Sequence, residues 1–261
     1  MRTLPIFVLL SVSGIYQVSA ASCNIASNSC LNGCCPEGTP NDNYLVDHTI
    51  FTLSGNKTTK LADWVSYIIE PQNLSGPKRT RTWKQDPNIQ VNDTLSPNDY
   101  SGANAACAYD RGHQAPLAAF SNNSLWANTN YLSNITPQKA ELNQGAWERL
   151  ENAERKLLSV AKYNKVYVVT GPYYTGESMC ALPNTSIKAI IPNGYWKTVS
   201  VVDNAGNSQS VSFMFRQDTA REVKYCNYIT SMNSIQSQTN LNILPNRNEV
   251  NNRTLITDLG C

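Results

Sequence analysis

The sequence predicts a single α+β domain, and two observations carry this prediction. Runs rich in Val, Ile, Thr, Tyr and Phe, bounded by Gly, Pro and Asn, recur along the chain and are typical of β-strands. One longer stretch, over residues 143–163, has the apolar spacing of an amphipathic helix. Neither an internal repeat nor a convincing linker divides the chain, so we expect one domain over residues 21–261.

Residues 1–20 have the features of a signal peptide. Arg2 is followed by an apolar run over residues 4–16, and residues 18–20 fit a small-residue cleavage site. A transmembrane anchor is the alternative, but the run is short and is interrupted by Ser and Gly. No later run is long and apolar enough to span a bilayer. We therefore expect a secreted, extracellular protein, periplasmic if the host is bacterial, without membrane attachment.

Short segments along the mature chain are predicted as strands. They lie at residues 44–53, 64–69, 107–113, 130–135, 165–170, 187–191, 195–202 and 210–215. Residues 204–207 have the composition of a hairpin turn between the last two strands. Residues 21–43 are rich in Cys, Asn, Pro and Gly, which indicates an N-terminal loop region held by disulfides. The polar residues 227–261 carry no clear pattern.

The helix is predicted to begin in a broken way. Thr136-Pro137 can start a helical segment, but Gly145 interrupts it, so we expect the regular helix to begin at Asn143 or Gln144 and to run to about residue 163. Its apolar stripe consists of Trp147, Leu150, Leu157, Leu158 and Ala161.

Three polar side chains share one side of this helix. Asn143, Glu151 and Arg155 are spaced by eight and four residues, which places them within about 120° of one another. The plain alternative is an ordinary Glu151–Arg155 ion pair on a solvated face. The helix by itself does not decide between a functional site and that alternative.

The chain contains eight cysteines, an even number that indicates a disulfide framework in an exported protein. The clustered Cys30, Cys34 and Cys35 could instead bind zinc, but there is no nearby histidine and no paired C-x-x-C unit. We therefore favour disulfides, whose pairing the residues alone leave open.

Three polar motifs follow one another in the middle of the chain. They are Asp110-Arg111-Gly112-His113, then Asn-Ile-Thr-Pro-Gln at 134–138, then Leu-Asn-Gln-Gly-x-Trp-x-x-Leu-Glu at 142–151. The chain has only two histidines, and His113 lies in the first motif. The other, His48, lies in a predicted strand with nothing nearby to complete a site, so we expect it to be structural.

These motifs, in this order and at this spacing, resemble those of the DNA/RNA non-specific endonuclease family, most closely its secreted Serratia-type branch. The similarity covers residues from about 49 to about 228 and again 260–261. It implies an α+β fold with a central antiparallel β-sheet, packed helices and a ββα-metal active site. It also implies disulfides from Cys30 to Cys34 or Cys35 and from Cys226 to Cys261; Cys107–Cys180 and Cys23 with the remaining N-terminal cysteine would complete four pairs.

The resemblance assigns a role to each motif position. His113 is expected to be the general base, Asn143 the protein ligand of one Mg²⁺, for which Mn²⁺ can substitute, and Glu151 the residue that orients metal-bound water. Asn134 is expected to hold the geometry, with its side chain in the cleft, so that its N-x-[ST] sequon stays unmodified. Asp110 is expected to fix the motif loop. The remaining expected site residues are the phosphate-binding arginines Arg81 and Arg155, with Arg111 as a weaker candidate.

The implied reaction is hydrolysis of DNA and RNA to 5′-phosphate and 3′-hydroxyl ends, with contacts to the phosphate backbone. Homodimers occur in the family, and the oligomeric state stays open here. The formal net charge of +2 is lower than that of a protein that binds nucleic acid tightly. It is compatible with a nuclease, because an enzyme must also release its product. A secreted nucleic-acid-binding module without catalysis is one alternative. A mitochondrial endonuclease G-like enzyme is another, which the signal peptide and the cysteines disfavour.

Overall fold

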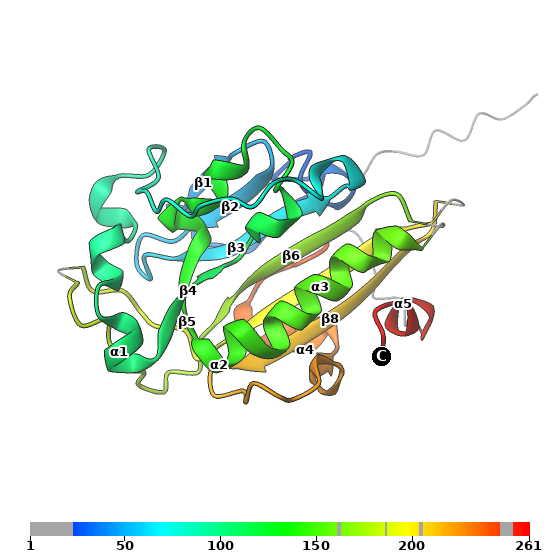
Figure 1. The fold of residues 1–261 in the computed structure, drawn as a ribbon. Helices are drawn as coiled ribbons and strands as arrows, with labels where there is room; N and C mark the ends of the chain where they lie inside the picture. Colours follow the sequence, from blue (N-terminus) through cyan, green and yellow to red (C-terminus); the bar gives the residue numbers. More distant parts are fainter. Residues whose placement is uncertain (1–22, 161–162, 186, 204–205, 246–252) are drawn as a thin grey trace, which may run out of the picture.

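The computed structural model describes residues 23–160, 163–185, 187–203, 206–245 and 253–261 (Figure 1). The predicted signal peptide and half of the predicted turn at 204–207 lie outside these residues. A seven-stranded antiparallel sheet forms the centre of the fold, in the order β1-β2-β3-β6-β7-β8-β9. Its strands are β1 (Tyr44–Asp47), β2 (Phe51–Gly55), β3 (Ala62–Ile69), β6 (Val166–Tyr173), β7 (Gly194–Val202), β8 (Ser208–Arg216) and β9 (Ile229–Thr230). The expected α+β fold with a central antiparallel sheet is confirmed.

Apolar layers cover both faces of this sheet, because neighbouring side chains on a strand point to opposite faces. On β6, Val168 contributes to one layer and Val169 to the other. The first layer contains α3 (Glu148–Lys156), which lies along the sheet in Figure 1. The second contains α4 (Met232–Thr239) and the N-terminal loop. Within the described residues, no helix combines the length and the apolar character needed to cross a membrane.

A separate two-stranded hairpin, β4 (Tyr109–His113) with β5 (Ile135–Lys139), crosses beside the sheet (Figure 1). The short helix α1 (Ala103–Cys107) precedes it, and α2 (Ala140–Leu142) follows it. Together with α3, this hairpin makes the expected ββα arrangement. The fifth helix, α5 (Arg253–Asp258), lies near the C-terminus.

The predicted strand at 44–53 is a hairpin of two strands, so that prediction was wrong in its connectivity. β1 ends at Asp47 and β2 begins at Phe51. Between them the Thr49 amide donates to Asp47 Oδ1 at 2.7 Å, and Thr49 has a φ of 71°. This Asx turn reverses the chain, whereas the β-branched composition alone indicated a continuous strand.

The return strand of the small hairpin was predicted too early. Asn130 ends one 3₁₀ turn, residues 132–134 form another, and the strand is Ile135–Lys139. Thr136 and Pro137 therefore lie in a strand and do not begin a helix. Pro137 stands opposite Arg111 in the ladder. A two-stranded hairpin has only edge strands, which tolerate the missing N–H of proline.

The helical segment begins at Ala140 and the regular helix at Glu148, both later than predicted, and the segment ends earlier. After α2, Asn143–Trp147 form a π-helical turn, α3 follows, and a single 3₁₀ turn ends the segment at Ser159. The break occurs at Gly145, where an added Cβ would stand 2.8 Å from the backbone of Arg221. Close packing of another segment against the π-turn therefore requires glycine here.

The other strand predictions are largely confirmed. Those at 64–69, 165–170, 195–202 and 210–215 correspond to β3, β6, β7 and β8. The strand predicted at 107–113 starts at Tyr109, because Ala108 ends α1 in the left-handed region with φ 54°. The strand predicted at 187–191 is absent from the described residues, which are irregular there.

Four disulfides staple the described chain: Cys23–Cys34, Cys30–Cys35, Cys107–Cys180 and Cys226–Cys261. The pairing expected from the resemblance is confirmed. No free cysteine remains among the described residues.

Candidate active site

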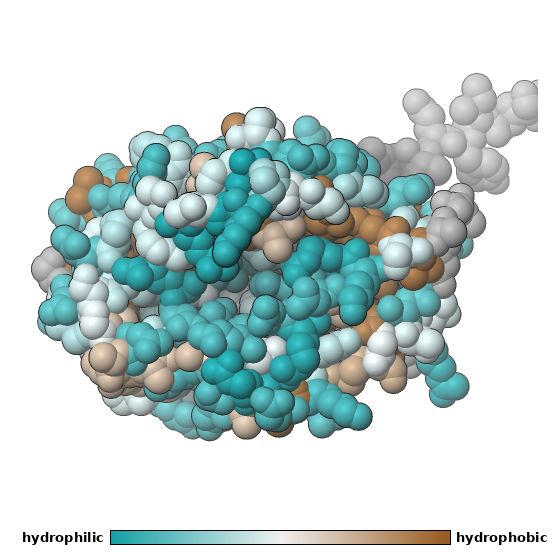
Figure 2. Space-filling view, in the orientation of Figure 1, coloured by the Kyte–Doolittle hydropathy of each residue, from teal (hydrophilic) through white to brown (hydrophobic). Residues whose placement is uncertain are grey.

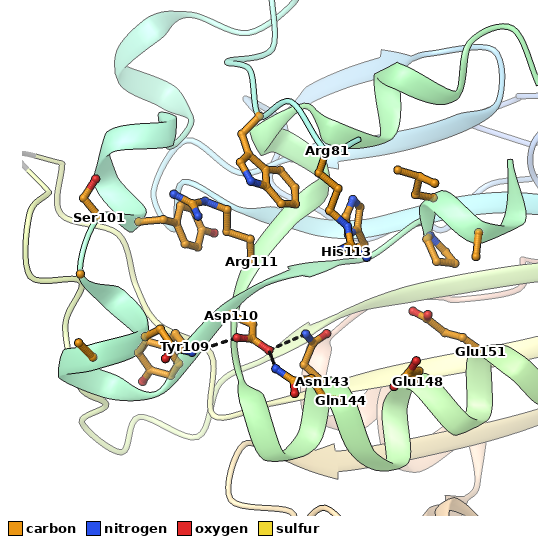
Figure 3. A pocket seen from close by; sticks show the side chains of 18 of the residues that line it. Arg81, Ser101, Tyr109, Asp110, Arg111, His113, Asn143, Gln144, Glu148 and Glu151 are labelled. Carbon is orange, nitrogen blue, oxygen red and sulfur yellow. Dashed lines mark hydrogen bonds between the residues drawn. The ribbon is translucent and has the colours of Figure 1, made fainter. Parts of the chain in front are cut away.

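The ββα unit forms one wall of an open cleft of about 860 Å³ (Figure 3). Among the predicted site residues, Arg81, Arg111, His113, Asn143, Glu151 and Arg155 line this cleft, and Asn134 does not. Figure 2 shows that the surface on this side of the molecule is largely hydrophilic. The structure thus brings together six of the seven residues predicted from the motifs.

His113 lies at the end of β4, where it pairs with Ile135 across the ladder. Its Nε2 is 3.3 Å from Asn130 Oδ1. An amide oxygen can only accept, so this contact places the proton on Nε2 and leaves the lone pair on Nδ1. Burial, and then the charge of Arg81, lower the pKa of His113 to about 4, although the Asn130 hydrogen bond opposes the shift. At neutral pH the ring is therefore unprotonated at one nitrogen and can act as a base.

Asn143 is oriented by Asp110 across the junction of helix and hairpin. Its Nδ2 donates to Asp110 Oδ2 at 2.9 Å, and the amide oxygen is directed away from Asp110 in Figure 3. The same carboxylate accepts from Gln144 Nε2 at 2.7 Å and from Asn104 Nδ2 at 3.0 Å. Asp110 thus fastens the motif loop, and the Asn143 oxygen remains the group suited to coordinate a cation.

Glu151 follows two turns later on the same side of the helix and lines the cleft with 13% of its side chain exposed. Burial raises the pKa of Glu151 to about 7, and the nearby Lys197 ammonium opposes this shift. A carboxyl group with such a pKa is sensitive to any cation placed beside it.

Arg155 completes this side of the helix. Its Nη2 donates to Asn152 Oδ1 at 2.7 Å, and its buried Nη1 has no hydrogen-bond partner within the described chain. The alternative of a Glu151–Arg155 pair on a solvated face does not fit, because both side chains line the cleft. An unpartnered guanidinium N–H at the cleft is well suited to an anionic oxygen.

The other two arginines differ in how freely they can reach a ligand. Arg81 is exposed at the mouth of the cleft. Arg111 is held between the rings of Trp83 and Tyr100, at 5.6 and 5.4 Å from their centroids, and donates to the Pro97 carbonyl at 3.1 Å. Arg111 is therefore partly committed to the fold, in line with its expected weaker role.

The expectation that Asn134 points into the cleft is wrong. Asn134 is 0% exposed. Its Oδ1 accepts from the Ala115 amide at 2.8 Å, and its Nδ2 donates to the Ala115 and Thr129 carbonyls, each at 2.9 Å. The side chain therefore points into the protein interior and holds the backbone that follows His113. Asn134 has this orientation because β5 starts only at the next residue, Ile135.

The remaining histidine has the structural role that was expected. His48 is buried, with Nε2 2.8 Å from Asp86 Oδ2, and the same oxygen accepts from Ser133 at 2.5 Å. This network joins the β1–β2 turn to the segment before Asn134 and stands outside the cleft lining.

Sequence reasoning missed two charged neighbours of the site, Lys197 and Glu154. Lys197 is fully buried in β7, 3.0 Å from Glu154 Oε1 and 3.9 Å from Glu151 Oε1. The only local signal was a lysine inside an apolar strand pattern.

Comparison with known proteins agrees with this geometry. The family model for DNA/RNA non-specific endonuclease matches residues 36–249. A nuclease of Serratia marcescens is 42% identical over 89% of this chain and 87% of its own length. Human mitochondrial endonuclease G is 33% identical over 52% of this chain and 45% of its own length. A crystal structure of an EndoG/EndoGI complex has the same fold, with a TM-score of 0.67 at 21% identity, covering 81% of this chain and 89% of that one. The chain therefore belongs to the DNA/RNA non-specific endonuclease family.

Proposed function

We propose that this endonuclease hydrolyses internal phosphodiester bonds of both DNA and RNA with a single Mg²⁺, leaving 5′-phosphate and 3′-hydroxyl ends. The observation that carries the proposal is the cleft itself, which holds the neutral imidazole of His113, the oriented amide of Asn143 and the guanidinium groups of Arg81 and Arg155.

The donor set fits a cation that keeps most of its water. The described residues contain no cluster of three or more His, Cys, Asp and Glu side chains that could enclose a metal ion. One amide oxygen, with a carboxylate close enough to act through water, suits Mg²⁺, which loses its waters reluctantly. Mn²⁺ accepts the same oxygen ligands. Asn143 would hold the ion, and Glu151 would orient its water.

The bound ion would neutralise phosphate charge and stabilise the departing 3′-oxygen. His113 takes a proton from water through Nδ1, and the water oxygen forms the new bond to phosphorus as the bond to the 3′-oxygen breaks. The departing 3′-oxygen takes a proton from another water molecule and becomes the 3′-hydroxyl. Arg81 and Arg155 bind the non-bridging oxygens, whose charge grows on the way to the transition state. Asp110 and Asn134 keep the amide of Asn143 and the segment after His113 in place.

Contacts of this kind explain why base sequence and sugar type would matter little. Guanidinium groups and a hydrated cation bind phosphate, which is the same at every nucleotide. The cleft is open, and the surface on this side of the molecule is largely hydrophilic (Figure 2).

We also propose that the enzyme acts outside the cytoplasm. Four disulfides persist in oxidising compartments. They accompany the signal-peptide features of residues 1–20.

A plasmid-nicking and RNA-cleavage assay tests the function. We expect cleavage of both substrates with Mg²⁺ and none after chelation, and labelling of the products should find phosphate at the 5′ ends. Cleavage undiminished by chelator, or products with 3′-phosphate, would overturn the metal or the end assignment.

A further inference from the structure

One lysine, Lys197, is fully buried next to the residues of the cleft. Lys197 lies in the middle of β7, facing α3, with 0% of its side chain exposed. Its ammonium is 4.3 Å from the centroid of the Trp147 ring, so the residue sits beneath the turn that carries Asn143. Its neighbours in the strand, Trp196 and Thr198, are buried core residues.

Two carboxylates from α3 face this ammonium. Glu154 Oε1 is 3.0 Å from Lys197 Nζ, and Glu154 is itself 0% exposed. Glu154 also accepts a hydrogen bond from the Tyr67 hydroxyl at 3.2 Å. Glu151 Oε1 is 3.9 Å from the same ammonium, on the side of the cleft. The order from core to cleft is therefore Tyr67, Glu154, Lys197, Glu151.

This arrangement is expensive for a purely structural purpose. Burying an ammonium and a carboxylate carries a desolvation penalty for each ion, and apolar residues of similar size usually stabilise a fold as well or better. The pair does provide a positive charge next to Glu151, whose carboxyl is otherwise driven toward its neutral form by burial.

We propose that Lys197, itself held by Glu154, is a positioning residue that favours the carboxylate form of Glu151 and fixes it at the cleft. There Glu151 can orient the water around the cation. This inference rests on the proposed function, since Glu151 matters only if a hydrated cation occupies the site.

The test removes both buried charges at once. In the variant Lys197→Met/Glu154→Gln the ammonium and the Glu154 carboxylate are removed together, and the substituted amide can still accept from the Tyr67 hydroxyl, so the protein should fold. We expect kcat on plasmid DNA to fall roughly 10- to 100-fold with KM changed less than about 2-fold, as for other residues that orient metal-site groups. Calorimetric titration with Mn²⁺, without nucleic acid, should show affinity weakened by roughly 10-fold.

A double-mutant cycle separates positioning from general disruption. If Lys197 acts through Glu151, adding Lys197→Met/Glu154→Gln to Glu151→Gln should lower kcat by no more than about 2-fold. The matched control is the partly exposed pair Lys60–Asp93, whose Nζ–Oδ1 distance is 3.1 Å. Lys60→Met/Asp93→Asn should leave kcat and Mn²⁺ affinity unchanged.

Wild-type kcat and Mn²⁺ affinity in the pair-deleted variant would overturn the inference, and so would an equal loss with and without Glu151. If thermal melting shows that this variant is unfolded, Lys197→Gln/Glu154→Gln carries the same prediction. Wild-type protein that fails to cleave with Mg²⁺ would refute the proposed function instead, which keeps the two failures distinct.

Discussion

Asp110 and Asn143 are joined by a hydrogen bond of 2.9 Å from the amide Nδ2 to the carboxylate Oδ2. Asp110 belongs to the strand that ends at His113, and Asn143 begins the π-turn that leads into α3. One hydrogen bond therefore sets the orientation of the expected metal ligand relative to the expected base.

Replacing Asp110 tests this relationship. Asp110→Asn keeps the volume but removes the charge that gathers the amides of Asn143, Gln144 and Asn104. We expect kcat to fall roughly 10- to 100-fold and the free energy of unfolding to fall by about 1–3 kcal/mol, measured by nicking assays and urea denaturation. The comparison variant Asn104→Ala removes only one exposed bond to Oδ1 and should cost much less. Equal effects of the two variants would argue that Asp110 does not orient Asn143.

The Cys107–Cys180 disulfide should stabilise the catalytic strand. It joins residues 73 positions apart, and Cys107 ends the helix immediately before β4. We expect Cys107→Ala/Cys180→Ala to lower the free energy of unfolding by about 2–4 kcal/mol. Guanidinium denaturation measures this loss, and a stability within about 0.5 kcal/mol of wild type would show that the bridge adds nothing.

Asn134 should escape N-glycosylation because it is inside the protein. Its sequon is complete, but the side chain is 0% exposed and bound to three backbone groups. Asn92 begins another sequon and is exposed, which makes it the matched control. In a glycosylating host, glycopeptide mass spectrometry should find carbohydrate at Asn92 and none at Asn134 of the folded enzyme. High occupancy at Asn134 in active protein would contradict the buried position.

The motifs allowed most of the site to be predicted, because each brings its chemistry in a few consecutive residues. His113 is the last residue of its strand, and the spacing of Asn143, Glu151 and Arg155 places them on one side of a helix even with the π-turn between them. Lys197 could not be predicted, since it reaches Glu151 only through the packing of β7 against α3.

Two wrong predictions from the sequence were that of one continuous strand over 44–53 and that of Asn134 pointing into the cleft. Each depended on where a strand ends or begins. The Asx turn at Asp47 divides a uniform β-branched run, and a shift in the start of β5 turns Asn134 from the cleft to the interior. The composition of a segment does not determine where its strands begin and end, because these positions also depend on individual hydrogen bonds to the backbone.

The acid limit of activity should lie well below the ordinary histidine range. Burial first, and Arg81 second, lower the pKa of His113 to about 4. The neutral ring is the active form, so the rate should fall as the pH drops through about 4 and not near 6.5. Because Glu151 also titrates, with a pKa of about 7, the profile is best measured in Glu151→Gln, which removes this second ionisation. In that background Arg81→Ala should move the acid limb of the pH–rate profile to higher pH, because the Arg81 charge no longer lowers the pKa of His113. A limb that stays near 6.5 would contradict the buried, neutral base.

Replacing His113 should separate catalysis from binding. His113→Ala removes the base and leaves Arg81, Arg155 and Asn143 in the cleft. We expect cleavage of plasmid DNA to drop by roughly 10²–10⁴-fold, while binding of a short duplex, measured by fluorescence anisotropy, stays close to wild type. This outcome would also exclude the alternative that the chain only binds nucleic acid, because a binding module without catalysis would show no cleavage that His113→Ala could reduce.

The matched control is His48→Ala, since these are the only two imidazoles in the chain. His48 pairs with Asp86 inside the fold and stands outside the cleft lining, so its loss leaves a buried carboxylate short of one partner. The free energy of unfolding should fall by about 1–3 kcal/mol, with kcat of the folded fraction nearly intact. If His48→Ala abolishes cleavage in protein that melts like wild type, or if His113→Ala cleaves at the wild-type rate, the base is not His113.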